Sequence, residues 1–257
     1  MVIERIAPSL ETLPRPVYPR SESLAAGSTS RAHAHPFGQL SFAGEGVLLV
    51  RTTSGSHVAP PQRAVWVPPG MAHEVAASKR AEMRSLYIRC DQNVFCPPRC
   101  LVLSVTPLAR ELILAACALP VHYDEHGPDG RLVAVLLDQL ASLPVADLSL
   151  PWPQDQRLAT ICQTLTDTPD DARTARAFAQ SAGMTERTLG RLFTAQTGLT
   201  FGNWRRRARL LASLSLLEAG HSVTTTAIEC GYDSTSAFIA AFREAFGVTP
   251  GAFVRGV

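Results

Sequence analysis

The sequence lacks a hydrophobic run long enough to cross a membrane, because its longest apolar stretches, such as 112–121, fall far short of the ~20 residues of a membrane span. Its first residues, MVIERIAPSLETL, carry charge and have no apolar core region, so we expect no cleavable signal. The six cysteines form no CxxC pair and outline no disulfide framework, which predicts free thiols. Because Cys90, Cys96 and Cys100 lie close in sequence, a redox or metal role is the alternative to small buried side chains.

What the sequence does contain is one pattern twice, within 172–250: a short apolar helix, a Gly-hydrophobe turn, a hydroxyl cap and a second helix. In each copy a glycine ends the first helix at positive φ and a hydroxyl residue caps the second: Gly183 with Thr185, and Gly231 with Ser234. Segment 201–219, taken as one helix, spans roughly 28 Å between the copies. That length is close to the ~34 Å turn that separates half-sites on DNA, so the pattern indicates two helices in successive major grooves.

The two second helices have different outer faces. In the first copy Leu189, Leu192 and Phe193 fall at i, i+3 and i+4, which predicts a buried stripe and leaves Arg187 and Arg191 facing outward. These two arginines are the best candidates for reading bases. In the second copy an apolar stripe precedes the turn and an aromatic stripe follows it: Val223, Ala227, Ile228, then Phe238, Ile239, Phe242 and Phe246. Its outward residues are small.

Positive charge is concentrated in the same part of the chain. Residues 172–257 contain ten Arg and five Asp or Glu, a balance of +5, whereas the whole chain carries +2. The charge therefore lies where DNA phosphates are expected. We expect Arg206 and Arg209 to contact phosphates, and at least one arginine of 205–209 to pack its stem over the core.

The rest of the chain predicts a β domain followed by helices. Short alternating segments at 39–43, 47–52, 63–67 and 83–88, divided by Gly and Pro turns, suggest a small barrel or jelly roll. Helices are expected from Thr106-Pro107 to about Ala118, from Arg131 to Leu143, and after a cap at Asp155. The prediction is an α+β chain with three parts: a barrel at 1–104, a helical segment and linker at 105–150, and an all-α domain at 151–257.

Histidines gather in the expected barrel. His33 and His35 lie on one face of a strand, and a later hairpin can bring His73 opposite them, with Gln39 nearby. Three imidazoles and an amide could hold a borderline divalent transition metal, whose occupancy would then fall below about pH 6.5. The alternative is that these histidines are hydrogen-bonded in a ligand pocket or in the barrel wall.

The helical pattern resembles a known family. The segment NWRRRARLLASLSLLEAGHSV, followed by GYDSTSAFIAAFREAFGVTP, resembles the DNA-binding domain of the AraC/XylS family of bacterial transcription regulators over about 85 residues. The resemblance implies that both recognition helices and their caps contact DNA: Thr185, Arg187, Thr188, Arg191, Ser234, Ser236, Ala237 and Ala240. Gly190 and the two alanines depart from the longer polar residues often found there, which suggests weaker, partly shape-based readout by the second helix.

The barrel also resembles a known fold. HAHPFGQL and VWVPPGMAHEV are similar to the cupin signatures HxHxxx(E)xxxxxxG and PxGxxH, with Gln39 in place of the usual Glu and with departures at Gln62 and Ala77. With MRSLYI, the combination most resembles AraC-type regulators with a cupin sensor. The resemblance implies an effector site formed by His33, His35, Phe37, Gln39, Trp66 and His73. Four of these residues would also be metal ligands: His33, His35, Gln39 and His73. The apolar members favour a small organic or aromatic effector over a sugar.

Together these features predict a cytoplasmic, ligand-responsive transcription regulator that binds double-stranded DNA and a small molecule and is not an enzyme. The alternative is a cupin-type metalloenzyme fused to a DNA-binding module, although Gln39 removes the usual iron ligand set. A purely architectural DNA-binding protein would not need the barrel. RNA polymerase and a second copy of the chain are candidate partners. The second copy would bind through leucine stripes with i, i+4 spacing, which core packing explains equally well: Leu108, Leu112, Leu136 and Leu140. The effector, the operator and the direction of regulation stay open.

Overall fold

The structure is a computed structural model that describes residues 3–5, 10–60, 62–77, 80–90, 95–146 and 148–255. Contacts divide the chain into two compact units, which are described separately. The first comprises Met1–Thr53 and His57–Ser149, and the second comprises Ser54–Ser56 and Leu150–Val257. Within the described ranges, no helix has both the length and the apolar character that crossing a membrane requires.

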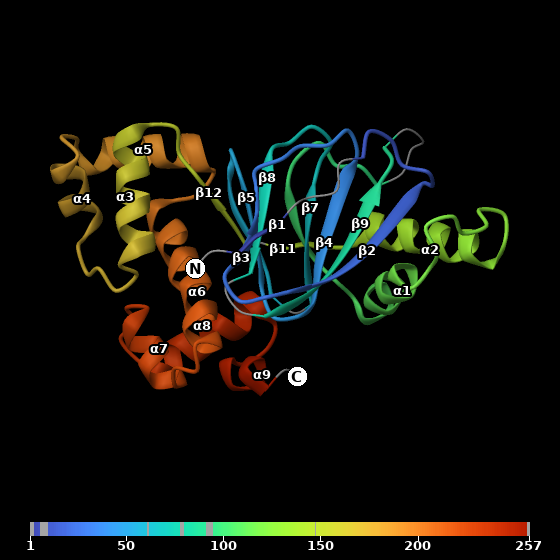
Figure 1. Ribbon diagram of the computed structural model, residues 1–257. Helices are drawn as coiled ribbons and strands as arrows, with labels where there is room; N and C mark the ends of the chain where they lie inside the picture. Colours follow the sequence, from blue (N-terminus) through green and yellow to red (C-terminus); the bar gives the residue numbers. More distant parts are fainter. Residues whose placement is uncertain are drawn as a thin grey trace. The chain divides into compact units, whose positions relative to one another are not determined.

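The described strands form two six-stranded sheets, ordered β1-β3-β8-β5-β6-β12 and β11-β10-β7-β4-β9-β2 (Figure 1). Their bounds are β1 (Ile3–Arg5), β2 (Val17–Leu24), β3 (Ser28–Ser30), β4 (Gly38–Glu45), β5 (Leu48–Thr52), β6 (Gly55–Ala59), β7 (Arg63–Val67), β8 (His73–Ala77), β9 (Ala81–Ile88), β10 (Leu101–Ser104), β11 (Val145–Ala146) and β12 (Ser149–Pro151). The start of β6 is grouped with the second unit, where Trp152 N donates to Ser54 O at 3.2 Å.

The second sheet has a polar face and an apolar face. In β4, Leu40 lies opposite Trp66 of β7 and Leu86 of β9, and these side chains join one apolar cluster with α1 (Pro107–Cys117) and α2 (Pro128–Ser142). Figure 1 shows these two helices beside β2 and β9. The alternate residues, Gln39 and Ser41, therefore point away from the helices, toward the barrel interior.

The second unit is helical. It contains α3 (Gln156–Asp167), α4 (Ala175–Ser181), α5 (Glu186–Thr197), α6 (Phe201–Glu218), α7 (Val223–Glu229), α8 (Thr235–Phe246) and α9 (Pro250–Arg255). Helix α6 contacts α3 and α5 as well as α7, α8 and α9, so it joins the two helix-turn-helix copies. Trp204 of α6 is fully buried, and its indole Nε1 donates to Pro151 O at 2.7 Å. Phe238, Phe242 and Phe246 form a buried stripe along α8.

These observations confirm the α+β fold class, and the four expected strands are present as β4, β5, β7 and β9. The expected helices after the barrel begin and end within a few residues of α1 and α2, and Asp155 caps α3. Further strands that the sequence analysis did not assign include β2, β6 and β8. The stripe residues Leu136 and Leu140 are fully buried in the core, whereas Leu108 is exposed.

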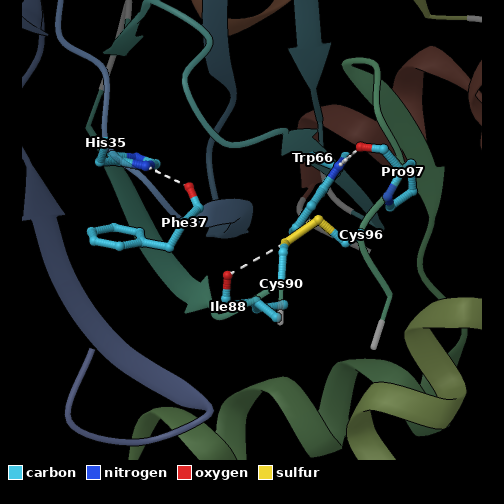
Figure 2. The surroundings of a disulfide bond; sticks show 7 residues. All are labelled: His35, Phe37, Trp66, Ile88, Cys90, Cys96 and Pro97. Carbon is cyan, nitrogen blue, oxygen red and sulfur yellow. Dashed lines mark hydrogen bonds between the residues drawn. A yellow bond between two sulfur atoms is a disulfide. The ribbon is translucent and has the colours of Figure 1, made fainter. Parts of the chain in front are cut away.

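The expectation that all six cysteines are free thiols is wrong for two of them. Cys90 and Cys96 form a disulfide, with Cα atoms 5.7 Å apart (Figure 2). Cys90 follows the end of β9 at Ile88 and Cys96 precedes the start of β10 at Leu101, and the spacing of the two cysteines in the sequence gives no indication that they pair. Cys100, Cys117, Cys162 and Cys230 are free, and burial raises the pKa of each thiol.

Candidate ligand site and nucleic-acid interface

The three histidines converge inside the first unit as expected, but His33 and His35 lie in the segment before β4 and not on a regular strand. His33 and His73 exchange two backbone hydrogen bonds, of 3.1 and 2.9 Å, and His35 O accepts from Gly70 N at 2.9 Å. One ring nitrogen from each histidine lies within 4.8 Å of the others. The Pro-Pro-Gly turn before β8 thus positions His73 against the segment that precedes β4.

Backbone carbonyls fix the tautomer of each of these rings. The Nδ1 atoms of His33, His35 and His73 lie 2.8, 2.6 and 3.0 Å from the carbonyl oxygens of Arg31, Phe37 and Met71, respectively. A carbonyl oxygen can only accept, so each Nδ1 carries the donated proton. A neutral ring with its proton on Nδ1 has a bare lone pair on Nε2, the arrangement found in histidines that bind metals.

Gln39 lies against two of these lone pairs. Its Oε1 is 3.0 Å from Nε2 of His35 and 3.0 Å from Nε2 of His73, and its Nε2 donates to Ser41 Oγ at 3.0 Å. With both rings protonated on Nδ1, three acceptors face one another. A cation between them would remove this conflict, as would a reversed amide that donates to the two rings.

Burial keeps His73 neutral. Its side chain is 1% exposed, and desolvation lowers its pKa to about 4 despite the hydrogen bond to Met71. Positive charge on the neighbouring rings of His33 and His35 would lower the pKa of His73 further. The ring of His73 is therefore neutral and available as a ligand at pH 7. It would stay neutral well below pH 6.5, the value near which an unperturbed histidine gains a proton.

Aromatic side chains flank this cluster, but Trp66 is not among them. Phe37 stacks on His35 with ring centroids 4.4 Å apart, and Tyr87 meets His35 edge-on at 5.5 Å. Trp66 instead lies opposite Leu40 on the helix-covered face, and its Nε1 donates to Pro97 O at 2.9 Å, away from His35 (Figure 2). The expectation that Trp66 lines the same pocket as the histidines is corrected, because its strand register turns it to the other face of the sheet.

Sequence reasoning also missed polar residues of the interior. Ser41 and Ser85 are fully buried and lie directly opposite each other in β4 and β9. The alternation of Gln39 and Ser41 with apolar Leu40 and Phe42 was the available signal, because a strand with this pattern presents its polar residues on one face.

In the second unit, the first helix-turn-helix copy forms as the sequence predicts. Gly183 has a φ of +67°, Thr185 Oγ1 accepts from Thr188 N, and Leu189 and Phe193 are buried in the core. Arg187 and Arg191 are exposed. Within the part of the chain that the structure describes, neither arginine forms an ion pair, so both are available to a ligand on this face.

The second copy repeats this geometry with smaller residues. Gly231 has a φ of +69°, and Ser234 Oγ accepts from Ala237 N at 3.1 Å. The outward set is exposed along α8: Ser236, Ala237 and Ala240. On α7, Ala227 is buried, but Ile228 is 65% exposed and does not belong to the apolar stripe in which we expected it.

Two arginines of α6 have distinct environments. Arg206 is exposed and pairs with Glu244. Arg209 Nε donates to Pro169 O at 2.9 Å and its Nη2 to Asp171 O at 3.4 Å, while a Cβ on Gly231 would lie 2.6 Å from that Nη2. The expected phosphate contact of Arg209 is therefore revised. The guanidinium of Arg209 connects α6 to the 169–171 segment and packs against the Gly231 turn. Arg209 is therefore the arginine of 205–209 that packs onto the folded unit, as expected for one of them.

A β sandwich with a buried polar cluster and a helical unit with two exposed recognition helices together define a DNA-binding protein with a separate ligand-binding unit. Family comparison agrees with this class. Residues 18–112 match the AraC-like ligand binding domain, and residues 178–256 match a helix-turn-helix domain.

Individual relatives extend the match over most of the chain. The HTH-type transcriptional regulator NimR of Escherichia coli K12 is 34% identical over 226 residues, which cover 88% of this chain and 82% of NimR. The HTH-type transcriptional regulator RipA of Corynebacterium glutamicum is 34% identical over 106 residues, 41% of this chain and 32% of RipA. The structure of ToxT from Vibrio cholerae aligns over 95% of this chain and 99% of ToxT at 9% identity, with a TM-score of 0.41 that carries no weight for function.

The chain belongs to the AraC family of transcription regulators. It combines an N-terminal ligand-binding domain with a C-terminal helix-turn-helix domain that binds DNA.

Proposed function

We propose that this regulator senses its signal inside the barrel, where His33, His35, His73 and Gln39 hold a divalent transition metal that forms part of the effector site. The observation that carries the proposal is the set of converging acceptors. Nε2 of His35 and of His73 faces Oε1 of Gln39 at 3.0 Å, with each Nδ1 already held by a carbonyl.

The donor set suits a borderline ion. Imidazole nitrogens bind Zn, Ni, Co and Cu, and a neutral amide oxygen adds less affinity than a carboxylate. The metal would supply a Lewis-acidic anchor for an oxygen or nitrogen atom of an effector. Phe37 and Tyr87 would then pack against the effector's apolar part.

Metal content tests the proposal directly. Protein purified without added metal should carry close to one equivalent of a transition metal, His73→Ala should lose it, and Gln39→Glu should bind it more tightly. His122→Ala, which changes an exposed histidine outside the cluster, is the matched control and should keep the metal. Metal-free parent protein whose melting temperature does not respond to Zn²⁺, Ni²⁺ or Co²⁺ would contradict the proposal and favour the reversed amide.

The DNA contacts are also a proposal. Arg187, Thr188 and Arg191 would read bases from α5, because the two arginines are exposed one turn apart on the face opposite the buried stripe. On α8 the exposed outward residues are small, so that helix would contribute mainly shape-based readout, with its cap and outer face in contact: Ser234, Ser236, Ala237 and Ala240. Arg206 and the cap Thr185 would contact phosphates.

Several properties follow from this assignment. The protein would act in the cytoplasm. It would have no catalytic activity of its own, because Gln39 leaves the histidines without the carboxylate of a facial triad. RNA polymerase and a second copy of the chain would be its protein partners. Of the stripe residues considered for dimerisation, Leu108 is the one that is largely exposed, at 55%.

A further inference from the structure

Strand β6 carries a histidine that the proposed metal site does not use. The side chain of His57 is 5% exposed, and among the described residues neither of its ring nitrogens has a hydrogen-bond partner. Burial lowers the pKa of His57 to about 4, so the ring is neutral at pH 7. A buried polar group without a partner is rare in native proteins, because its lost hydration is not compensated.

The position of His57 in the sheet shows where its ring points. Strands β5 and β6 are joined by a two-residue turn at 53–54, so Val50 and His57 lie opposite each other and share a face. In the next pair of strands, Val50 lies opposite Val75 and Thr52 lies opposite His73. His57 therefore faces the same interior as His73.

His57 is nevertheless too far away to join the metal site. Strands β8 and β6 are separated by β5, and two spacings of ~4.8 Å place His57 roughly 10 Å across the sheet from His73. Ligand nitrogens lie only ~2 Å from a metal ion. The same sheet offers a second group without a partner, since the hydroxyl of Ser28, which lies opposite Ala77 and is 1% exposed, has none among the described residues.

We infer that His57 is a second anchor for the effector, and that it binds a neutral group that both donates and accepts hydrogen bonds, such as a hydroxyl or a carboxamide. The inference rests on the proposal that the effector lies inside the barrel. A neutral imidazole offers one N–H donor and one lone pair, which such a group complements. A carboxylate would satisfy only the donor and an ammonium only the acceptor, and each would bring an unpaired charge into a buried site.

The effector class is therefore a small uncharged organic molecule with an apolar body. Val50 and Val75 lie beside His57 on the same face and are both buried, so the part of the molecule near the polar group meets aliphatic carbon. One end of the molecule would hydrogen bond to His57, and the other would approach the histidine cluster.

Four probes with the same ring but different polar groups test this class on the full-length protein: benzamide, benzyl alcohol, benzoate and benzylamine. Binding is measured by thermal shift and by ¹⁵N spectra of the histidine rings. Benzamide and benzyl alcohol should bind about tenfold more tightly than the charged probes, a difference of about 1.4 kcal/mol, because a charged probe leaves one of the two ring nitrogens unpaired. Both neutral probes should move the His57 ring resonances. His57→Phe should remove that preference, and His126→Phe, which changes an exposed histidine outside the barrel interior, should keep it.

A second measurement separates an effector contact from a structural role. Without any probe, His57→Phe should melt at the same or a higher temperature than the parent, because it removes a polar group that has no partner. Equal binding of the neutral probes to parent and His57→Phe, or no response of the parent to either neutral probe, overturns the inference. Should His57→Phe fail to fold, the ¹⁵N resonances of His57 in the parent decide the question, since unchanged resonances with benzamide bound exclude the contact. If the protein contains no metal but still binds the neutral probes more tightly than the charged ones through His57, the metal proposal is contradicted and the inference about His57 stands.

Discussion

Lowering the pH should destabilise the sensor unit through His57. The folded protein holds this ring neutral down to about pH 4, whereas an exposed histidine in the unfolded chain binds a proton at about pH 6.5. Between these two values the unfolded state therefore carries the extra proton. Stability is fully present above pH 6.5 and decreases as the pH falls toward 4.

The size of the effect follows from the same two values. A difference of about 2.5 pKa units corresponds to about 3 kcal/mol of unfolding free energy at 1.36 kcal/mol per unit. Stabilities of small domains lie near 5–15 kcal/mol, so this single residue accounts for a large share of acid sensitivity. His73, whose pKa is also lowered to about 4 by burial, adds a similar effect in the absence of metal.

Urea unfolding of the full-length protein at pH 7.5 and pH 4.5, followed by tryptophan fluorescence, measures this loss. The comparison is between the parent and His57→Phe, because the difference between them removes the contribution of the helical unit that both share. The variant should lose about 2.5 kcal/mol less than the parent on acidification, because pH 4.5 lies just above the folded-state pKa of about 4. His126→Phe, at an exposed position, is the control and should behave as the parent does. An identical loss in parent and His57→Phe would refute the reasoning.

Three further predictions concern the helical unit. Arg187→Ala and Arg191→Ala should each lower specific DNA affinity by roughly 1–3 kcal/mol, whereas Arg206→Ala should weaken binding to specific and random duplexes alike and reduce the salt slope by about 1. Binding assays on both duplexes at several salt concentrations check this, and an unchanged base preference in both Arg187 and Arg191 variants would contradict it. Arg209→Met should lower the unfolding free energy by about 1–3 kcal/mol, because the carbonyls of Pro169 and Asp171 lose their donor; loss of DNA affinity with unchanged stability would restore a phosphate contact. A fragment that starts at residue 150 should fold, bind DNA and be more stable in urea than one that starts at 155, because only the longer one contains buried Leu150 and the Pro151 carbonyl that pairs with Trp204. Equal stability of the two fragments would show that these contacts contribute little.

The helix-turn-helix copies could be predicted from the sequence because their determinants are local. A glycine at positive φ and a hydroxyl cap each act within a few residues, and the 3.6-residue period fixes which side chains are buried. Gly183, Thr185, Gly231 and Ser234 consequently have the conformations and hydrogen bonds that the pattern predicts. Ile228 departs from it because the buried side of α7 is formed by Thr226 and Ala227, and Ile228, the next residue around the helix, is 65% exposed.

The barrel was harder to predict because its contacts depend on strand register. The segment 64–67 is apolar at every position, so its sequence does not reveal that Trp66 faces the helices. The Ser-Gly-Ser sequence at 54–56 is typical of a turn, so strand β6, which begins at Gly55 and carries His57, was not predicted. The pairing of Cys90 with Cys96 has no local signature either, because the six-residue spacing matches no common disulfide motif.

The two faces of the second sheet explain how the barrel can be both stable and responsive. The helix-covered face is apolar, with Leu40 and Leu86 fully buried in the cluster that includes α1 and α2, and it stabilises the unit whether or not a ligand is present. The opposite face places polar groups, Ser41 and Ser85 among them, in a buried interior. Polar groups buried without complete hydrogen bonding destabilise the ligand-free barrel, and a ligand that pairs with them recovers that free energy on binding. Effector binding should therefore stabilise the barrel through its interior, while the apolar face keeps the fold intact without it.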